Sequence, residues 1–247
     1  MYFKFLKNLL SQGVSTWAVD LKNALFHLAF PHVCEGCGCD IPDPSQLLCL
    51  SCLGSLPQTS FHLHGNNPVE KLFWGRLPIT HATAQYYFTK ASLMQRLMHQ
   101  LKYKGNKEAG LYLGRLMGQA LSASNRFIHT DVLVPLPLHR LREKQRGYNQ
   151  AALLCQGISE VMNKPVLKNI VGRTIQTESQ TKKGRISRWQ NIEGRFELLD
   201  TSDIKDKHVL LVDDVVTTGA TLESCGRALM EGGLKKLSIA TLCFSSH

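Results

Sequence analysis

The sequence has no long uninterrupted apolar run. Its first 31 residues are apolar and basic, but Gln12, Asp20 and Lys22 interrupt them, whereas about 18 consecutive apolar residues are needed to cross a bilayer. They also lack a signal-peptide core with small residues at a cleavage site. We therefore expect no transmembrane segment. An amphipathic helix is expected here instead, either packed on the rest of the protein or in contact with a membrane surface.

Negative charge is scarce in one segment of the chain. The 247 residues include 29 Lys and Arg against 19 Asp and Glu, a formal net charge of +10. Leu138–Arg195 alone holds 12 of the basic residues and 4 of the acidic ones. Such a local excess of positive charge indicates an anionic partner, for example a phosphorylated metabolite or nucleic acid. The sequence also lacks internal repeats and low-complexity stretches, which excludes a repeat architecture.

Cysteine is scarce outside one short segment, where five of the eight cysteines lie. This distribution argues against a secreted disulfide protein and for a metal site in a reducing cytosol. Two Cys-x-x-Cys pairs separated by eleven residues suit tetrahedral Zn²⁺. Four protein ligands leave the ion no open position, so we expect a structural and not a catalytic zinc. The predicted ligands are Cys34, Cys37, Cys49 and Cys52, and Cys39 is an extra thiol that competes for one of these places.

Apolar runs alternate with helical patterns from about Thr80 onward. With 43% apolar residues, the chain can bury the core of one α/β domain and carry a small additional module. The apolar runs are continuous, which is typical of a mostly parallel sheet covered on both faces. The expected parts are an amphipathic helical leader (1–31), a zinc-binding four-cysteine module (32–56), a linker (57–79) and the α/β domain (80–247).

One apolar run ends in two carboxylates, in the stretch HVLLVDDVVTTGAT. His208–Val212 is predicted to form the strand, so Asp213 and Asp214 stand at its carboxyl end, where parallel α/β sheets bind ligands. The turn Val215–Ala220 leads into a helix, whose first N–H groups, with threonine hydroxyls and a glycine, form a cradle for one phosphate. The carboxylates accept hydrogen bonds from a vicinal diol or help to hold hydrated Mg²⁺. Ribose 5-phosphate offers both groups.

Two other interpretations of this stretch remain. A buried strand that ends in a polar turn explains either half of the pattern but not both in register. The phosphoacceptor pocket of a receiver domain also has apolar strands that end in paired aspartates. There the acidic pair follows the first strand, whereas few residues follow Asp213 and Asp214 in this chain.

A second predicted strand runs directly into a basic loop, in the stretch VLVPLPLHRLREKQRGYNQ. Guanidinium groups suit bidentate contact with phosphate, and a strand end places them at the same crevice. A solvated basic loop is the alternative. The residues that we expect to reach the crevice are Arg140, Arg142, Lys144 and Arg146. The polar, basic segment Thr174–Trp189 is a candidate for a loop that closes over the site.

The stretch VLLVDDVVTTGAT resembles the phosphoribosyl pyrophosphate (PRPP) motif of type I phosphoribosyltransferases. The resemblance implies that the acidic pair contacts the ribose hydroxyls, that the Thr-Thr-Gly-Ala-Thr turn encloses the 5-phosphate, and that Mg²⁺ binds with PRPP. The predicted PRPP-binding residues are Asp213, Asp214, Val215, Val216, Thr217, Thr218, Gly219, Ala220, Thr221, Arg140, Arg142 and Lys102. The predicted catalytic residues are Asp213, Asp214 and Arg146.

The cysteine module and this motif, together with LKYKG, VPLPLHRLREKQRGYNQ and RTIQTESQ, resemble the ComF family over nearly the whole chain beyond the first thirty residues. The resemblance implies a type I phosphoribosyltransferase (Rossmann-like) fold behind a zinc-ribbon-like module. It also implies a link to natural transformation, in which incoming single-stranded DNA reaches the cytoplasm. The family's characteristic positions fall on Lys102, Arg146, Gly147, Asn149, Gln150, Arg173, Gln176, Arg185, Arg188 and Asn191.

These observations predict transfer of a phosphoribosyl group from PRPP to an unidentified acceptor, with release of pyrophosphate. The rival is a non-catalytic protein that binds PRPP or single-stranded DNA, with Tyr148 and Trp189 stacking on bases. An adapter role toward competence or DNA-translocation proteins is compatible with either. We expect a cytoplasmic protein, or one peripheral to the inner membrane.

Overall fold

The computed structural model describes residues 32–41, 43, 45–173 and 196–245, which fall into two compact units, Met1–Ser55 and Leu56–His247. In the first unit, Val33 bridges Asp40, and a short helix, α2 (Leu50–Gly54), follows. The predicted leader over 1–31 lies outside the described residues. None of the helices in the described ranges is long and apolar enough to cross a membrane.

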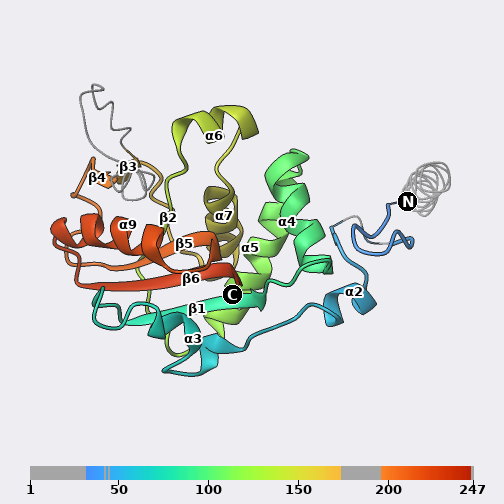
Figure 1. Ribbon diagram of the computed structural model, residues 1–247, viewed down its shortest axis with the longest axis horizontal. Coiled ribbons are helices and arrows are strands. Elements are labelled where there is room, and N and C mark those ends of the chain that lie inside the picture. The colour runs from blue at the N-terminus through green and yellow to red at the C-terminus, as the bar shows by residue number, and fades with distance from the viewer. Residues whose placement is uncertain (1–31, 42, 44, 174–195, 246–247) are drawn as a thin grey trace, which may run out of the picture. The chain divides into compact units, whose positions relative to one another are not determined.

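The second unit alternates strands with helices (Figure 1). Its elements are η1 (Phe61–Leu63), α3 (Pro68–Lys71), β1 (His81–Tyr87), α4 (Leu93–Tyr103), α5 (Lys107–Ser122), β2 (Val132–Pro135), α6 (Arg140–Arg146), α7 (Gln150–Met162), β3 (Val171–Arg173), β4 (Phe196–Leu198), β5 (His208–Val216), α9 (Ala220–Glu231) and β6 (Lys236–Phe244).

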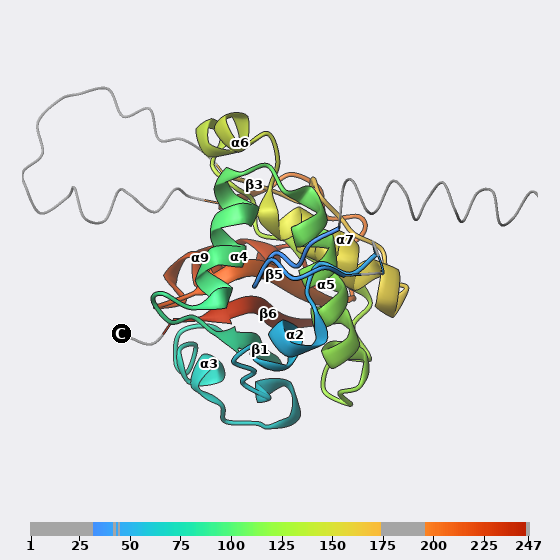
Figure 2. The ribbon, with the colours of Figure 1, turned by 90° about the vertical axis from the view of Figure 1, so that its right-hand side faces the viewer.

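Four strands form one parallel sheet in the order β1-β6-β5-β2. The central strands are buried almost throughout, as their continuous apolar sequences require. Helix α9 packs on one face, and α7, backed by α5, packs on the other (Figure 2). This arrangement confirms the predicted α/β architecture with a mostly parallel sheet. Because all four strands run the same way, their carboxyl ends share one edge of the sheet.

Helices α5 and α7 approach each other very closely. A Cβ atom on Gly114 would lie 2.5 Å from the carbonyl oxygen of Leu154, and one on Gly157 would overlap the carbonyl oxygen of Leu111. Glycine therefore lets the two backbones touch at these positions. Helix α7 in turn packs against β2 and β5, whose carboxyl ends carry the polar groups described below.

Three details differ from the sequence-based expectations. Strand β5 continues to Val216, because Val215 and Val216 pair with the last residues of β6, so Asp213 and Asp214 lie within the strand. The basic segment after β2 is the helix α6 and not a loop. It has no breaker between the His139 side chain, which accepts from the Leu141 N–H, and Gly147, which ends the helix at a φ of 78°.

The third difference concerns residues 57–79, which the sequence suggested as a linker. This segment contains η1 and α3, and the buried side chains of Phe61, Val69, Phe73 and Leu77 belong to the core of the second unit. Two of its polar residues, Asn67 and Glu70, are also buried, and Asn67 donates to the carbonyl oxygen of Ala82 at 2.9 Å. Prolines, glycines and histidines had suggested a linker, but the apolar residues between them pack into the core, so the segment is part of the second unit.

A two-stranded antiparallel sheet, β3-β4, is an additional feature that the sequence did not predict. Each strand has only three residues, which is too short for a recognisable alternation of apolar and polar positions. The candidate closing loop Thr174–Trp189 falls between these strands and lies outside the described residues, as do Gln176, Arg185, Arg188 and Asn191.

Candidate functional site

The side chains of Asp213 and Asp214 on β5 lie in different environments. Asp213 lines a small cavity with the residues that follow it, whereas Asp214 faces helix α4, where its Oδ2 lies 2.9 Å from Nζ of Lys102. Neighbouring residues of a strand point to opposite faces, which explains the division. The Asp214 N–H also donates to Oδ1 of Asp213 at 2.7 Å, so the two groups form one connected cluster.

The carboxyl group of Asp213 is held in an unfavourable environment for a charge. Burial, followed by the negative charge of Asp214, raises the pKa of Asp213 well above its ordinary value. The positive charges of Lys102 and Arg173 act in the opposite direction and only partly offset this rise. A positively charged or hydrogen-bond-donating ligand beside Asp213 would therefore stabilise its ionised form.

The loop Thr217–Thr221 follows β5 and opens helix α9. It surrounds a cavity of about 50 Å³, a size that suits a single small group. Gly219 stands at the N-cap position of α9 with a φ of 76°, a conformation that glycine adopts without strain. Backbone N–H groups at such a helix start, with the positive end of the helix dipole, favour an anion. The described lining is Asp213, Val215, Val216, Thr217, Thr218, Gly219, Ala220, Thr221 and Leu222.

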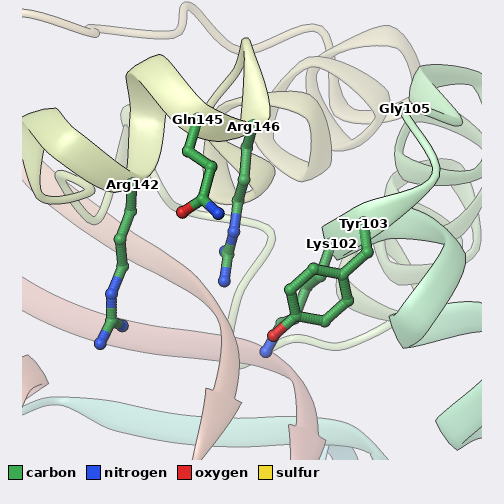
Figure 3. Close-up of a pocket in the computed structure, with 6 residues that line it drawn as sticks. All are labelled: Lys102, Tyr103, Gly105, Arg142, Gln145 and Arg146. Atoms are coloured by element: carbon green, nitrogen blue, oxygen red, sulfur yellow. The ribbon is translucent and has the colours of Figure 1, made fainter.

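A second cavity, of about 400 Å³, lies between α4 and α6. We call it the cation pocket, and it is lined by Lys102, Tyr103, Gly105, Arg142, Gln145 and Arg146. Figure 3 shows Arg142, Gln145 and Arg146 extending from the same side of α6, with Arg146 beside Lys102 and Tyr103. Residues three and four positions apart share a face of a helix, which is why Arg142 and Arg146 reach the same pocket.

Two contacts orient Arg146 within the cation pocket. Its Nη1 donates to Oε1 of Gln150 at 2.8 Å, and its guanidinium lies 5.5 Å from the centre of the Tyr103 ring. Tyr103 itself is 66% exposed. The pocket thus combines three cations with one accessible aromatic face, a combination that suits a polyanion or an anion attached to a flat ring.

Arg140 belongs to a different cavity, of about 720 Å³, on the other side of α6. Its lining mixes charges of both signs with apolar side chains, and includes Glu143, Lys168 and Arg173. The sequence had grouped Arg140 with Arg142 and Arg146 as one set of phosphate donors. The helical twist of α6 separates them.

Asn149, a position that the family resemblance picked out, and Tyr148, a predicted stacking residue, both bond to backbone oxygens near α6. Asn149 donates to the carbonyl oxygen of Leu136 at 2.9 Å and caps the start of α7. The Tyr148 hydroxyl donates to the carbonyl oxygen of Leu101 at 2.6 Å, so this ring is committed to the protein and Tyr103 is the accessible one. Trp189, the other predicted stacking residue, lies outside the described residues.

The first unit gathers cysteine sulfur atoms at one point. Those of Cys34, Cys37, Cys39 and Cys49 all lie within 4.8 Å of one another, so Cys39 stands in a quartet for which the spacing had favoured Cys52. The Cys52 thiol also interacts with Cys34, Cys37 and Cys49. Three of the cysteines, Cys34, Cys37 and Cys49, are common to both ligand sets.

The hydrogen bonds at Cys34 suit a thiolate, whereas contacts with Cys37 and Cys49 raise the pKa of the Cys39 thiol to about 12. The N–H groups of Gly36 and Cys49 both donate to Sγ of Cys34 at 3.3 Å. Burial works against ionisation of Cys34, but donors from Cys49, Cys37 and Gly36 outweigh it and lower the pKa to about 6. Sulfur ligands for zinc must be deprotonated, so the cluster fits a tetrahedral metal ion such as Zn²⁺.

Sequence reasoning missed the residues that support the Thr217–Thr221 loop from behind. Phe73 and Arg76 contact it from the segment that had suggested a linker. No signal in the sequence marks them, because neither lies in a motif and both are distant from the loop along the chain.

Comparisons with known proteins bear on both units. The family described as phosphoribosyl transferase domain matches residues 157–247. Competence protein F of Haemophilus influenzae is 30% identical over 217 residues, which are 86% of this chain and 90% of that protein. DNA utilization protein YhgH of Escherichia coli K12 is 29% identical over 231 residues, which are 92% of this chain and 95% of that protein.

Two further comparisons are more distant. Competence protein ComFC of Bacillus subtilis is 30% identical over 149 residues, which are 59% of this chain and 57% of that protein. Among solved structures, the B. subtilis glutamine PRPP amidotransferase in complex with ADP and GMP aligns with a TM-score of 0.40 at 14% identity, over 59% of this chain and 30% of that one.

Proposed function

The chain belongs to the competence protein F family, and from that premise we propose that this phosphoribosyltransferase-like protein, linked to competence, binds PRPP with Mg²⁺ and transfers its phosphoribosyl group. The observation that carries the proposal is the ion pair between Lys102 and Asp214. It joins the cation pocket to the acidic pair and the Thr217–Thr221 loop. An anion cradle, two diol acceptors and a polycationic pocket therefore form one continuous site.

The three groups of PRPP match three parts of this site. The loop Thr217–Thr221 would enclose the 5-phosphate through its backbone N–H groups and threonine hydroxyls. Asp213 and Asp214 would accept hydrogen bonds from the ribose hydroxyls. Lys102, Arg142 and Arg146 would neutralise the pyrophosphate. The raised pKa of Asp213 supports this arrangement, because hydroxyl donors or a nearby cation would relieve the repulsion from Asp214.

The proposed reaction breaks the bond between C1 of the ribose and the pyrophosphate oxygen, which keeps the electron pair. A new bond forms between C1 and a nucleophilic atom of the acceptor, which loses a proton. The chain's contribution is to hold both ends of PRPP so that C1 is exposed, and to stabilise the charge that grows on the leaving group. The oxygen-rich acidic pair fits hydrated Mg²⁺, which would supply further positive charge at the pyrophosphate.

A calorimetric titration of PRPP with Mg²⁺ tests the binding step. We expect the zinc-loaded wild type to bind and the Asp213→Ala/Asp214→Ala variant to lose binding. A matched control, Asp203→Ala/Glu231→Ala, removes the same charge from exposed positions that line none of the three cavities, and should bind normally. A folded wild type that does not bind PRPP would contradict the proposal.

Transfer itself is tested by measuring pyrophosphate release from PRPP in the presence of candidate nucleophiles, including nucleobases, amines and single-stranded DNA. The acidic-pair variant supplies the background rate. We expect release that depends on both an acceptor and the intact acidic pair.

A non-catalytic protein that binds PRPP or single-stranded DNA is the second candidate, and the exposed Tyr103 beside three cations favours it. Aromatic faces next to basic side chains bind unpaired bases with little sequence preference. Tyr103→Ala distinguishes the two functions, because it should weaken DNA binding much more than PRPP binding, which loses only one of the two contacts that orient Arg146. We expect either activity in the cytoplasm, where thiols such as those of the cysteine cluster stay reduced, with competence or DNA-translocation proteins as partners.

A further inference from the structure

Arg76 reaches the Thr217–Thr221 loop from a distant part of the chain. Its Nη1 donates to the carbonyl oxygen of Thr218 and to that of Leu72, both at 3.0 Å. Arg76 and Thr218 are 142 positions apart in the sequence. The contact therefore fixes the loop to the segment between α3 and β1.

The guanidinium of Arg76 is itself held by helix α9. Its Nη2 forms an ion pair with Glu223, one turn into the helix that the loop opens. Arg227 bonds to the same carboxylate at 2.8 Å and donates to the backbone oxygen of Arg76. Both arginines lower the pKa of Glu223, so its charge is retained. These groups close a ring of contacts between the loop, α9 and the segment around Arg76.

Phe73 supports the same loop by packing. Its ring is fully buried, and a Cβ atom placed on Gly219 would stand 3.0 Å from it. The ring therefore lies directly against the backbone of the loop and leaves it no room to move in that direction. Arg76 and Phe73 thus hold two adjacent residues, Thr218 and Gly219, by two different kinds of contact.

We propose that Arg76 and Phe73 are positioning residues that hold the Thr217–Thr221 loop in its anion-binding conformation, an inference that rests on the proposed binding of PRPP. The C=O and N–H groups of a trans peptide point in opposite directions. By holding the Thr218 carbonyl, Arg76 turns the N–H of Gly219 away from itself and fixes its direction. Phe73 prevents the peptide from rotating back.

The inference separates two parts of PRPP that the site binds in different places. Loss of Arg76 should affect the 5-phosphate, which the loop holds, and not the pyrophosphate, which the cation pocket holds. A merely structural role would lower stability and weaken both parts together. Comparing two ligands therefore distinguishes the two roles.

The experiment measures the dissociation constants of Mg²⁺-PRPP and of Mg²⁺-pyrophosphate by calorimetry for the wild type, Arg76→Ala and Arg76→Lys. We expect Arg76→Ala to bind PRPP about tenfold more weakly, the effect of losing one hydrogen bond from a charged donor. Pyrophosphate affinity should stay unchanged. Arg76→Lys keeps the charge and one donor, so it should recover part of the loss and serves as the second variant if Arg76→Ala folds poorly.

Arg115→Ala is the matched control. Arg115 pairs with Glu160 at 3.1 Å and is about as exposed as Arg76, but it lies on α5 and lines none of the three cavities. It should leave both dissociation constants unchanged. If Arg76→Ala binds PRPP as tightly as the wild type, or loses pyrophosphate and PRPP affinity equally, the inference is overturned. If the folded wild type binds no PRPP, the proposed function fails, and the inference fails with it.

Discussion

The Thr217–Thr221 loop and helix α6 are both directed at anions, but they are built in opposite ways. The loop offers backbone groups, and the start of α9, the ring of Phe73 and the side chain of Arg76 hold it from behind. Helix α6 offers the ends of long side chains and buries none of its own residues. A preorganised backbone loses little entropy on binding, whereas flexible arginines must be ordered by the ligand. The loop should thus provide a binding site of fixed shape, whereas α6 should provide positive charge.

The local sequences reflect this difference. The loop needs a glycine at its centre, because Gly219 has a positive φ and faces Phe73. Helix α6 needs only basic residues at the right spacing and caps at its ends, where His139 and Gly147 stand. A single methyl group should therefore damage the loop severely, whereas α6 should be affected only slightly by changes that keep its charges.

The largest effect is expected from Gly219→Ala. A side chain at this positive φ costs about 1–2 kcal/mol, and its Cβ atom would press on the Phe73 ring at 3.0 Å. Together these should displace the loop and weaken PRPP binding by about 100-fold or more, as measured by calorimetry. Gly233→Ala is the control, since Gly233 has a φ of 75° but only one neighbouring atom, at 4.0 Å. Normal PRPP binding by Gly219→Ala would contradict the view that the loop, unlike α6, depends on an accurately held backbone.

The next effect is expected from Arg142→Ala/Arg146→Ala, which empties the cation pocket of its two guanidinium groups. PRPP affinity should fall about 30-fold at low salt, and the loss should shrink as salt is added, because exposed charges are screened. Titrations at two ionic strengths measure this. The control Arg140→Ala/Lys144→Ala removes the same net charge from the same helix. Equal losses in the two double variants would mean that charge acts without regard to the face of α6.

Asp213→Asn should separate stability from binding. Burial and the charge of Asp214 raise the pKa of Asp213 in the folded protein. At pH values between the pKa of the unfolded state and that of the folded state, the folded protein therefore binds one more proton than the unfolded chain. Stability contributed by Asp213 therefore falls as the pH rises through that window. Above it, asparagine removes an unfavourable charge from a half-buried position, and Tm should rise by about 2–4 °C, the shift that a gain of ~1 kcal/mol produces in a domain of this size. PRPP affinity should drop.

Thermal unfolding of the wild type and Asp213→Asn between pH 4 and pH 8 checks the sign of this effect. The difference in Tm should shrink toward the acidic end, where the aspartate is protonated in the folded state and the pH approaches the ordinary aspartate pKa that holds in the unfolded state. Asp203→Asn, at an exposed position, should show no such trend. A variant that melts below the wild type at neutral pH would contradict the explanation.

The smallest effect is expected from Gly147→Ala. Gly147 ends α6 at a φ of 78°, with no other atom near its Cβ position, so alanine costs only the backbone strain of about 1–2 kcal/mol. The end of α6 that carries Arg146 should fray slightly, and PRPP affinity should fall about twofold to threefold. Titration against Gly233→Ala, which has similar strain elsewhere, isolates the contribution of α6. A loss as large as that of Gly219→Ala would show that α6 needs an exact backbone after all.

Features that depend on neighbouring residues could be predicted before the structure was known. Continuous apolar runs between helical patterns predicted the parallel α/β fold, because the period of a strand or helix is visible within a few residues. The acidic pair and the Thr-Thr-Gly-Ala-Thr turn could be recognised as one candidate site for the same reason. The cysteine pairs predicted a thiol cluster, although their spacing favoured Cys52 and the structure places Cys39 in the quartet.

Contacts between distant residues, in contrast, depend on how the elements pack in three dimensions. The pairing of Lys102 with Asp214 and of Arg76 with Thr218 joins segments more than a hundred positions apart. The division of the basic residues between two cavities arose because their segment is a helix, so that Arg140 and Arg142 point to different sides. Local patterns specify strands, helices and turns, but packing the apolar faces of those elements against one another sets which polar groups share a site.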